Sequence, residues 1–310
     1  MLQINGLTKT YDDLTAVNNL HLSLETGDIF GFIGPNGAGK TTTIRMLSTL
    51  LPPTAGTATI DGIDLISNPD EMRGKIGYMP DYFGIYDDVK SWEYLDFFAA
   101  AYKIPSKARP GLIDDVLELT DLTVKKDAYV NSLSRGMKQR LCLAKTLLHD
   151  PKLLLLDEPA SGLDPRARIE LKELLKELSN MGKTILISSH ILPELADFCN
   201  KVGIIEKGNL LLNGGMDEIL AQINGGKCNM VRFADGEDIG KAIAIIQEIA
   251  GVAKADEYDG QLQITFDHAQ VAPYQLLNAL VFAGCRVESF TESKLDLEDL
   301  FMSVTKGLVQ

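Results

Sequence analysis

The chain opens with alternating apolar and polar positions and later carries continuous apolar runs. Residues 2–7 and 17–24 alternate over most of their length, a pattern typical of half-buried antiparallel strands. Residues 29–33 are all apolar or glycine, and residues 152–156 contain four consecutive leucines. Short continuous runs of this kind are expected of strands buried on both faces of a parallel sheet. The chain therefore predicts a fold with both antiparallel and parallel strands.

Helical periodicity appears between these runs. It predicts helices over residues 91–102 and 112–119, with several aromatic side chains in the first, and a third helix over residues 133–148. A fourth helix begins at Asp164 and Pro165, because aspartate is a favoured cap and proline a favoured first helical residue. Further strands are predicted at residues 57–60, 76–80 and 183–189, and a hairpin at residues 202–213.

After about residue 215 the chain changes character. Residues 224–227, with the sequence Asn-Gly-Gly-Lys, predict a flexible joint, and strands alternate with helices beyond it. We expect a first domain at residues 1–215 and a small α+β domain at residues 216–310. The strands predicted in the second domain are 228–234, 252–257, 261–266 and 285–290, and the helices are 238–250, 273–283 and 296–305.

Composition and charge narrow the class of protein. The 310 residues carry a net charge of −13, and the part from Met216 onward contains 7 basic and 15 acidic side chains. This acidic balance argues against a nucleic-acid surface. The four cysteines have no metal-binding spacing, and no basic region followed by an apolar core opens the chain. Residues 269–285 are too often interrupted by polar side chains for a membrane span. We expect a cytoplasmic protein.

Residues 34–41 have the spacing G-x-x-x-x-G-K-T of a phosphate-binding loop. They lie between a predicted strand and a predicted helix, which is the context that such a loop requires. Glycines let the backbone N–H groups turn towards phosphate oxygens, and the helix N-terminus adds partial positive charge. Lys40 is then expected at the β- and γ-phosphates and the Thr41 hydroxyl at Mg²⁺. The motif predicts a site for a nucleoside triphosphate.

Two acids close the leucine run that follows residue 152. Asp157 and Glu158 stand at its carboxyl end, where ligands of open α/β sheets bind. An aspartate there can hold Mg²⁺, and the adjacent glutamate can orient and deprotonate an attacking water. We therefore predict that Asp157 is a metal ligand and Glu158 a general base.

A second surface suited to phosphate lies at the start of the helix over residues 133–148. Ser134 and Gly136 offer a hydroxyl, backbone N–H groups and a helix dipole. One chain cannot easily present this surface and the loop at residues 34–41 to the same phosphate. The arrangement predicts two subunits placed head to tail, each completing the other's site.

These motifs together resemble those of the nucleotide-binding subunit of an ABC (ATP-binding cassette) transporter. Residues 34–41 match the Walker A motif, residues 153–158 the Walker B motif and residues 133–140 the family signature. Residues 161–164 resemble the D-loop, and Ser189 with His190 resembles the switch histidine. The resemblance covers residues 1–215. It implies an α/β fold of the P-loop NTPase type, with a mixed sheet core, an antiparallel β subdomain and a helical subdomain.

The resemblance also assigns roles to residues. It implies ATP and Mg²⁺ as ligands, with Tyr11 stacked on adenine, Glu158 as the base, His190 at the γ-phosphate, and Lys40 at the phosphates. Thr41, Asp157 and Asp81 are implied at the metal, and Ser134 and Gly136 at the partner subunit's nucleotide. Read without the family, a loop tyrosine such as Tyr11 is normally surface packing, and a lone histidine at a strand end such as His190 is more often structural. The loop positions implied in nucleotide binding are Gly34, Asn36, Gly37, Ala38, Gly39, Lys40, Thr41 and Thr42.

Two positions depart from the family pattern. The family usually has glycine where this chain has Arg135, so contacts at that position are open. It usually has glutamine where this chain has Asp81. An ionised carboxylate can still bind Mg²⁺ or orient water, but it cannot donate a hydrogen bond as an amide does.

The signature variant and the ending at residues 297–301 resemble ATPases of ABC export systems with separate membrane subunits. This implies a transmembrane permease and a second ATPase subunit, in a homodimer or heterodimer, as partners at the cytoplasmic face of the membrane. The aromatic residues at 91–102 are then either core or permease contacts. The rival hypothesis is an ABC ATPase that acts on DNA or ribosomes. Short helices between the two Walker motifs, one cassette per chain and the acidic charge argue against it.

Overall fold

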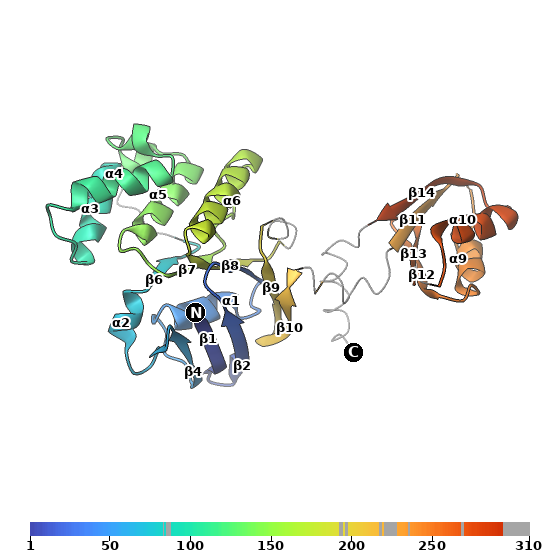
Figure 1. Ribbon diagram of the computed structural model, residues 1–310, viewed down its shortest axis with the longest axis horizontal. Helices are drawn as coiled ribbons and strands as arrows, with labels where there is room; N and C mark the ends of the chain where they lie inside the picture. Colours follow the sequence, from blue (N-terminus) through green and yellow to red (C-terminus); the bar gives the residue numbers. More distant parts are fainter. Residues whose placement is uncertain are drawn as a thin grey trace. The chain divides into compact units, whose positions relative to one another are not determined.

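The computed structural model describes residues 1–82, 84, 88–191, 195, 198–216, 219, 228–234, 236–267 and 270–293. The chain divides into two compact units, Met1–Met216 and Asp217–Gln310, shown in Figure 1 from blue to yellow and from yellow to red. Within the described residues, no helix is both long and apolar enough to cross a membrane.

The first unit is built on a six-stranded sheet in the order β10-β9-β3-β8-β7-β6. Five of its strands run parallel, and β10 pairs antiparallel with β9 at one edge. The buried runs predicted from the sequence are its central strands, which are buried at every position because the sheet is covered on both faces. The strands are β3 (Ile29–Ile33), β6 (Ile76–Met79), β7 (Leu153–Asp157), β8 (Thr184–Ser189), β9 (Lys201–Glu206) and β10 (Asn209–Gly215).

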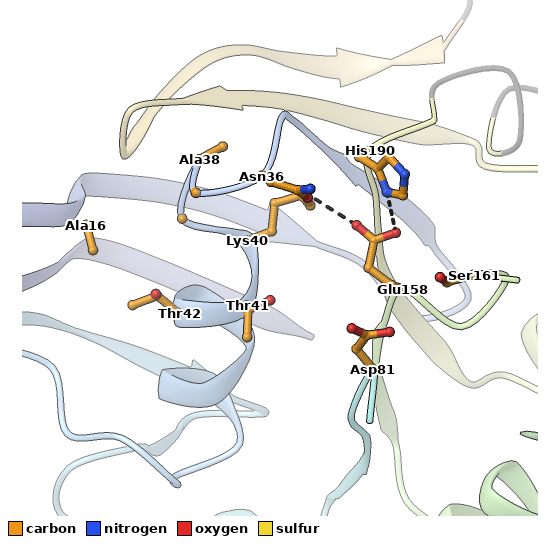
Figure 2. Close-up of a pocket in the computed structure, with 12 residues that line it drawn as sticks. Ala16, Asn36, Ala38, Lys40, Thr41, Thr42, Asp81, Glu158, Ser161 and His190 are labelled. Atoms are coloured by element: carbon orange, nitrogen blue, oxygen red, sulfur yellow. Dashed lines mark hydrogen bonds and ion pairs between the residues drawn. The ribbon is translucent and has the colours of Figure 1, made fainter. Parts of the chain in front are cut away.

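The register of the parallel strands brings their carboxyl ends together. Ile33 is opposite Ser189, and Asp157 is opposite Ser188. The segments that follow β3, β7 and β8 therefore meet at one edge of the sheet, where Lys40, Glu158 and His190 lie close together (Figure 2).

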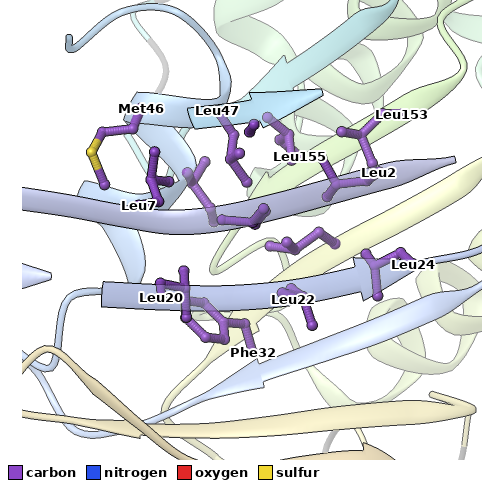
Figure 3. Packing of buried hydrophobic residues seen from close by; sticks show 14 of the residues in the cluster. Leu2, Leu7, Leu20, Leu22, Leu24, Phe32, Met46, Leu47, Leu153 and Leu155 are labelled. Carbon is purple, nitrogen blue, oxygen red and sulfur yellow. The ribbon is translucent and has the colours of Figure 1, made fainter. Parts of the chain in front are cut away.

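A second, antiparallel sheet has the order β2-β1-β4-β5. Its apolar side chains share one core with the parallel sheet and with helix α1, as Figure 3 shows for Leu7, Leu20, Phe32 and Leu155. Helix α1, which follows the glycine loop, contributes Met46 and Leu47 to this core and is thereby fixed. The strands are β1 (Leu2–Tyr11), β2 (Leu14–Leu24), β4 (Ala55–Ile60) and β5 (Ile63–Asp64).

Three of the helices, α3, α4 and α5, gather at the end of the first unit that lies away from the antiparallel sheet (Figure 1). Helix α6 begins as predicted, since the Asp164 carboxylate accepts the Ala167 N–H at 2.9 Å. In α3, Tyr94 is buried in the core whereas Phe97 is exposed. The helices are α1 (Lys40–Leu47), α2 (Pro69–Arg73), α3 (Ser91–Ala101), α4 (Arg109–Leu119), α5 (Arg135–Leu147) and α6 (Pro165–Asn180), with 3₁₀ turns at Thr123–Lys125 and Val130–Ser132.

The second unit is a four-stranded antiparallel sheet in the order β12-β13-β11-β14, with two helices, in the split βαβ arrangement. This confirms the predicted α+β pattern over the described residues. The helix predicted at 296–305 and the joint at 224–227 lie outside them. The elements are β11 (Cys228–Phe233), α9 (Ile239–Gln247), β12 (Val252–Tyr258), β13 (Gln261–Phe266), α10 (Pro273–Phe282) and β14 (Val287–Ser293).

Candidate functional site

The loop between β3 and α1 contains positions that only glycine can occupy. Gly39 has a φ of +114°, and a Cβ added there would lie 2.5 Å from the carbonyl oxygen of Ala16. A Cβ added at Gly34 would lie 2.2 Å from the carbonyl oxygen of Ile205. Because the obstacles are backbone atoms, no side-chain movement could make room. The glycines of the motif are required by the close approach of two neighbouring strands.

Segments far along the chain also hold this loop by backbone hydrogen bonds. Gly208, at the turn between β9 and β10, donates its N–H to the carbonyl of Ala38 at 2.9 Å. The carbonyl of Gly208 in turn accepts the N–H of Asn18 at 2.9 Å, and Gly34 donates to the carbonyl of Ser189 at 3.3 Å. The loop is therefore held in place by β2, β8 and the β9–β10 turn.

Beside the loop is a pocket of about 330 Å³. Residues from five separate segments of the first unit face it, as the labelled side chains in Figure 2 show. The parallel register described above brings together the segments that follow β3, β6, β7 and β8, and β2 of the antiparallel sheet adds Ala16. The pocket is lined by Ala16, Asn36, Gly37, Ala38, Gly39, Lys40, Thr41, Thr42, Asp81, Glu158, Ser161 and His190.

Lys40 is the buried cation of this pocket, with only 5% of its surface exposed. Its ammonium donates to the carbonyl of Gly34 at 2.7 Å and to that of Pro35 at 3.2 Å. It also lies 3.5 Å from the Glu158 carboxylate. These three oxygens offset the free energy of burying a charge, which is large for an unpaired ammonium group.

Glu158 lies between Lys40 and His190 (Figure 2). One carboxylate oxygen faces the Lys40 ammonium, and the other lies 2.8 Å from Nδ1 of His190. A carboxylate can only accept, so Nδ1 carries the proton of this hydrogen bond. The backbone of Glu158 is left-handed, with a φ of +50°, which is unfavourable for a residue with a side chain. The position of the Glu158 carboxylate is therefore set by this backbone conformation and by its contacts with Lys40 and His190.

Asp157 is buried at the end of β7, with 1% of its surface exposed. Its Oδ1 accepts the hydroxyl of Ser188 at 2.7 Å and that of Thr41 at 3.1 Å. The Ser188 hydroxyl also accepts the N–H of Glu158 at 2.9 Å. Burial raises the pKa of the nearby Tyr78 phenol, and the negative charge of Asp157 adds to the rise. Ser188 thus connects both acids, a role that the sequence did not indicate.

The donor set at Asp157 and Thr41 has the chemistry that Mg²⁺ prefers. Magnesium takes hard oxygen ligands, usually one or two carboxylates together with substrate phosphates and water, and a hydroxyl and a carboxylate meet here. Among the described residues no group of three or more His, Cys, Asp or Glu side chains could hold a metal alone. The residues fit a cation that is bound jointly with a phosphate ligand.

Two further predicted site residues differ in where they lie. Asp81, which follows β6 and Pro80, is exposed and lines the pocket opposite the loop (Figure 2). Tyr11 does not line it. The Tyr11 ring is 44% exposed at the end of β1, with the Lys9 ammonium 5.2 Å from its centroid.

Ser134 and Gly136 lie outside this pocket, at the N-terminus of α5. The Ser134 hydroxyl caps the helix by accepting the N–H of Met137 at 3.3 Å. Ser134 is exposed, and Gly136 packs beside Leu163 and Ala167 at the start of α6. Within one chain these two residues and the loop at residues 34–41 form separate surfaces.

Two family models match the chain. Residues 17–161 match the model described as ABC transporter. Residues 214–305 match the model described as the C-terminal domain of DrrA1-3-like ATP-binding proteins.

Curated relatives match over nearly the whole chain. Nod factor export ATP-binding protein I of Burkholderia orbicola is 34% identical over 98% of this chain and 96% of its own length. The linearmycin resistance ATP-binding protein LnrL of Bacillus subtilis is 30% identical over 98% of both chains.

Solved structures match the first unit. An ATP-binding subunit of an ABC transporter has a TM-score of 0.65 and 29% identity over 72% of this chain and 93% of its own. The cassette MJ0796, solved as a dimer in a post-hydrolysis state with ADP and Pi, has a TM-score of 0.63 and 25% identity over 70% of this chain and 99% of its own. With its glycine loop, paired acids and motif order, the chain belongs to the ATP-binding subunits of ABC transporters, a family of ATPases.

Proposed function

We propose that this chain hydrolyses ATP in the pocket beside residues 34–41, in a closed pair of subunits, and thereby drives export through a separate transmembrane permease. The observation that carries the proposal is the position of Glu158 between Lys40 and His190. A general base must be held at a fixed place beside the phosphate site, and Lys40 and His190 each contact one oxygen of the Glu158 carboxylate.

In this mechanism some pocket residues bind the phosphates of ATP, and others act on the proton of the attacking water. The loop N–H groups and Lys40 bind the phosphates, and Lys40 can exchange its contact with Glu158 for a phosphate oxygen. Glu158 then accepts a proton from the attacking water, and His190 holds the carboxylate through Nδ1. Thr41 and Asp157 would hold Mg²⁺, with Asp81 as a further oxygen ligand, and the cation would neutralise charge on the phosphates.

The proposal includes a second subunit because Ser134 and Gly136 lie outside the lining of this chain's own pocket. In a head-to-tail pair, each of these helix N-termini would meet the nucleotide bound by the partner. The partner is an identical chain or a related ATPase. We also place Tyr11 on the adenine side, since it stands at the end of β1 on an exposed surface where a base can stack.

The export direction rests on the relatives, which are named for Nod factor export and linearmycin resistance. We place the chain at the cytoplasmic face of the membrane, attached through the permease. We assign residues 1–215 to ATP hydrolysis and residues 216–310 to a regulatory role or a dimer contact.

The test uses Glu158→Gln, which preserves the shape of the site and removes the base. We expect turnover to fall by about 10²–10⁴ and a dimer to persist with ATP and Mg²⁺ but not with ADP. Size-exclusion chromatography with light scattering measures the mass. Adding Ser134→Arg should break the dimer, because bulk and charge then occupy the docking surface. A Glu158→Gln protein that stays monomeric at saturating ATP, alone and with its native partner subunit, would contradict the composite site.

A further inference from the structure

Arg135, the first residue of α5, reaches the turn that follows Glu158. Its Nη2 donates to the carbonyl oxygen of Ser161 at 3.0 Å. The guanidinium also lies flat against Gly162, since a Cβ added at that glycine would be 2.4–2.6 Å from three guanidinium atoms. Gly162 has a φ of +67°, a conformation that favours glycine. Arginine at 135 and glycine at 162 therefore fit each other.

The contacted carbonyl belongs to the turn that presents the base. Ser161 donates its N–H to the carbonyl of Glu158 at 3.0 Å, which closes the turn. Glu158 holds a left-handed backbone, and such a conformation persists only where the surrounding contacts favour it. Ser161 also lines the pocket. A hydrogen bond to the Ser161 carbonyl thus restrains the segment whose other end carries the carboxylate.

The start of α5 is itself firmly placed beside this turn. A Cβ added at Gly136 would lie 3.4 Å from Cβ of Ala167 and 3.6 Å from Leu163, so the two helix starts are in close contact. The Arg135 side chain therefore lies within reach of the turn, and its planar guanidinium donates to the Ser161 carbonyl while one face packs on Gly162. A lysine would keep the charge but lose the flat packing surface.

We propose that Arg135 is a positioning residue that holds the turn 158–161 so that Glu158 faces the pocket. The proposal rests on the proposed function, in which Glu158 is the base. Arg135 stands between Ser134 and Gly136, which are assigned to the partner's nucleotide. One short segment then connects the phosphate contact of one site with the base of the other.

The main experiment compares Arg135→Ala and Arg135→Lys with the wild-type full chain. For Arg135→Ala we expect kcat to fall by about 10- to 100-fold, as for a misplaced reacting group, while the ATP dissociation constant stays within about twofold. Arg135→Lys should recover part of the rate. Steady-state turnover and titration with a fluorescent ATP analogue measure the two quantities. A normal kcat in a folded Arg135→Ala protein would overturn the proposal.

Gly162→Ala perturbs the same contact from the other side. Its added methyl group should displace the guanidinium and lower kcat without changing ATP affinity. Because both variants break one contact, the loss that comes from this contact counts once in the double variant. The methyl group also strains the left-handed backbone at 162, but the double variant should still lose less than the product of the two single effects. A double variant that loses the full product would overturn the shared contact. The matched control is Arg166→Ala, which removes an arginine that is 90% exposed and pairs with Glu170; its kcat should not change.

The decisive comparison uses the Glu158→Gln background. If Arg135 acts through Glu158, adding Arg135→Ala should leave the residual single-turnover rate and the ATP-dependent dimer unchanged. A further loss of rate, or loss of the dimer, would show that Arg135 instead touches the partner's nucleotide, and the proposal would be wrong. If Glu158→Gln does not lower turnover, then Glu158 is not the base and the positioning role of Arg135 is wrong as well. If Glu158→Gln lowers turnover but Arg135→Ala does not, only the positioning role of Arg135 is wrong.

Discussion

The two units of the molecule differ in how their buried polar side chains are connected to one another. In the first unit, Lys40, Asp157 and Ser188 are buried at one edge of the parallel sheet. Asp157 accepts hydrogen bonds from the hydroxyls of Ser188 and of Thr41, the neighbour of Lys40, and the Lys40 ammonium donates to the carbonyl of Gly34. In the described part of the second unit, Asn229 is the one fully buried polar residue, and its Oδ1 has no hydrogen-bond partner there. The rest of that core is apolar.

This difference separates a reactive region from a packing region. Burying polar groups is unfavourable unless fixed partners compensate, so a group of satisfied buried charges indicates a site that is built for a ligand. An isolated amide among apolar side chains has no such organisation. The comparison favours chemistry in the first unit and an accessory role for the second.

The largest expected effect comes from removing the buried cation. Lys40→Ala should lower turnover by about 10²–10³, as for loss of one preorganised electrostatic contact, and should also weaken ATP binding. Phosphate release and nucleotide titration measure the two effects. The control is Lys152→Ala, at a half-exposed lysine paired with Asp61. Near-normal turnover by folded Lys40→Ala would contradict the inference that the buried polar groups of the first unit form the reactive site.

The candidate site shows which structural features could be predicted from the sequence alone. The strand, glycine loop and helix around Lys40 were predictable, because glycine spacing and an apolar run are local features. Ser188 was not, since its hydroxyl reaches Asp157 only through the register of β7 and β8. The contact of Arg135 with Ser161 likewise depends on how two helices pack.

Element boundaries show the same limit. Helix α4 begins at Arg109, three residues before the prediction, because Pro110 stands in its first turn, where a missing N–H is tolerated. The stacking of Tyr11 on adenine stays a prediction, since Tyr11 lies at the end of β1 and is not among the residues that line the pocket. An exposed aromatic side chain carries no local signal that separates a base-stacking role from surface packing.

A smaller effect is expected in the second unit. Asn229→Val removes an unpartnered buried amide and places a β-branched side chain in a strand, so the unit should gain about 1 kcal/mol, roughly fivefold in protection. Hydrogen–deuterium exchange of β11 and β13 measures this, while ATP turnover stays unchanged. The control is Thr265→Val, at a half-buried position of β13. Faster exchange in Asn229→Val would show that the amide is needed.

The smallest effect is expected from removing the second unit. Residues 1–216 contain all the described residues that line the pocket, so the shortened chain should bind ATP within about twofold of the full chain. Circular dichroism establishes folding, and titration with a fluorescent ATP analogue gives the affinity. A folded fragment that binds no nucleotide would show that the second unit contributes to the site.

The hydrogen bond between Ala38 and Gly208 has a consequence for synthesis in the cell. Gly208 follows Ala38 by 170 residues along the chain. At about 5–20 residues per second, a ribosome needs roughly 10–30 s to make that interval. During this time the glycine loop lacks the turn that holds it, and β7 is made before β8, a strand that pairs with it. The loop therefore gains this backbone support only after the β9–β10 hairpin has left the ribosome, late in the synthesis of the first unit.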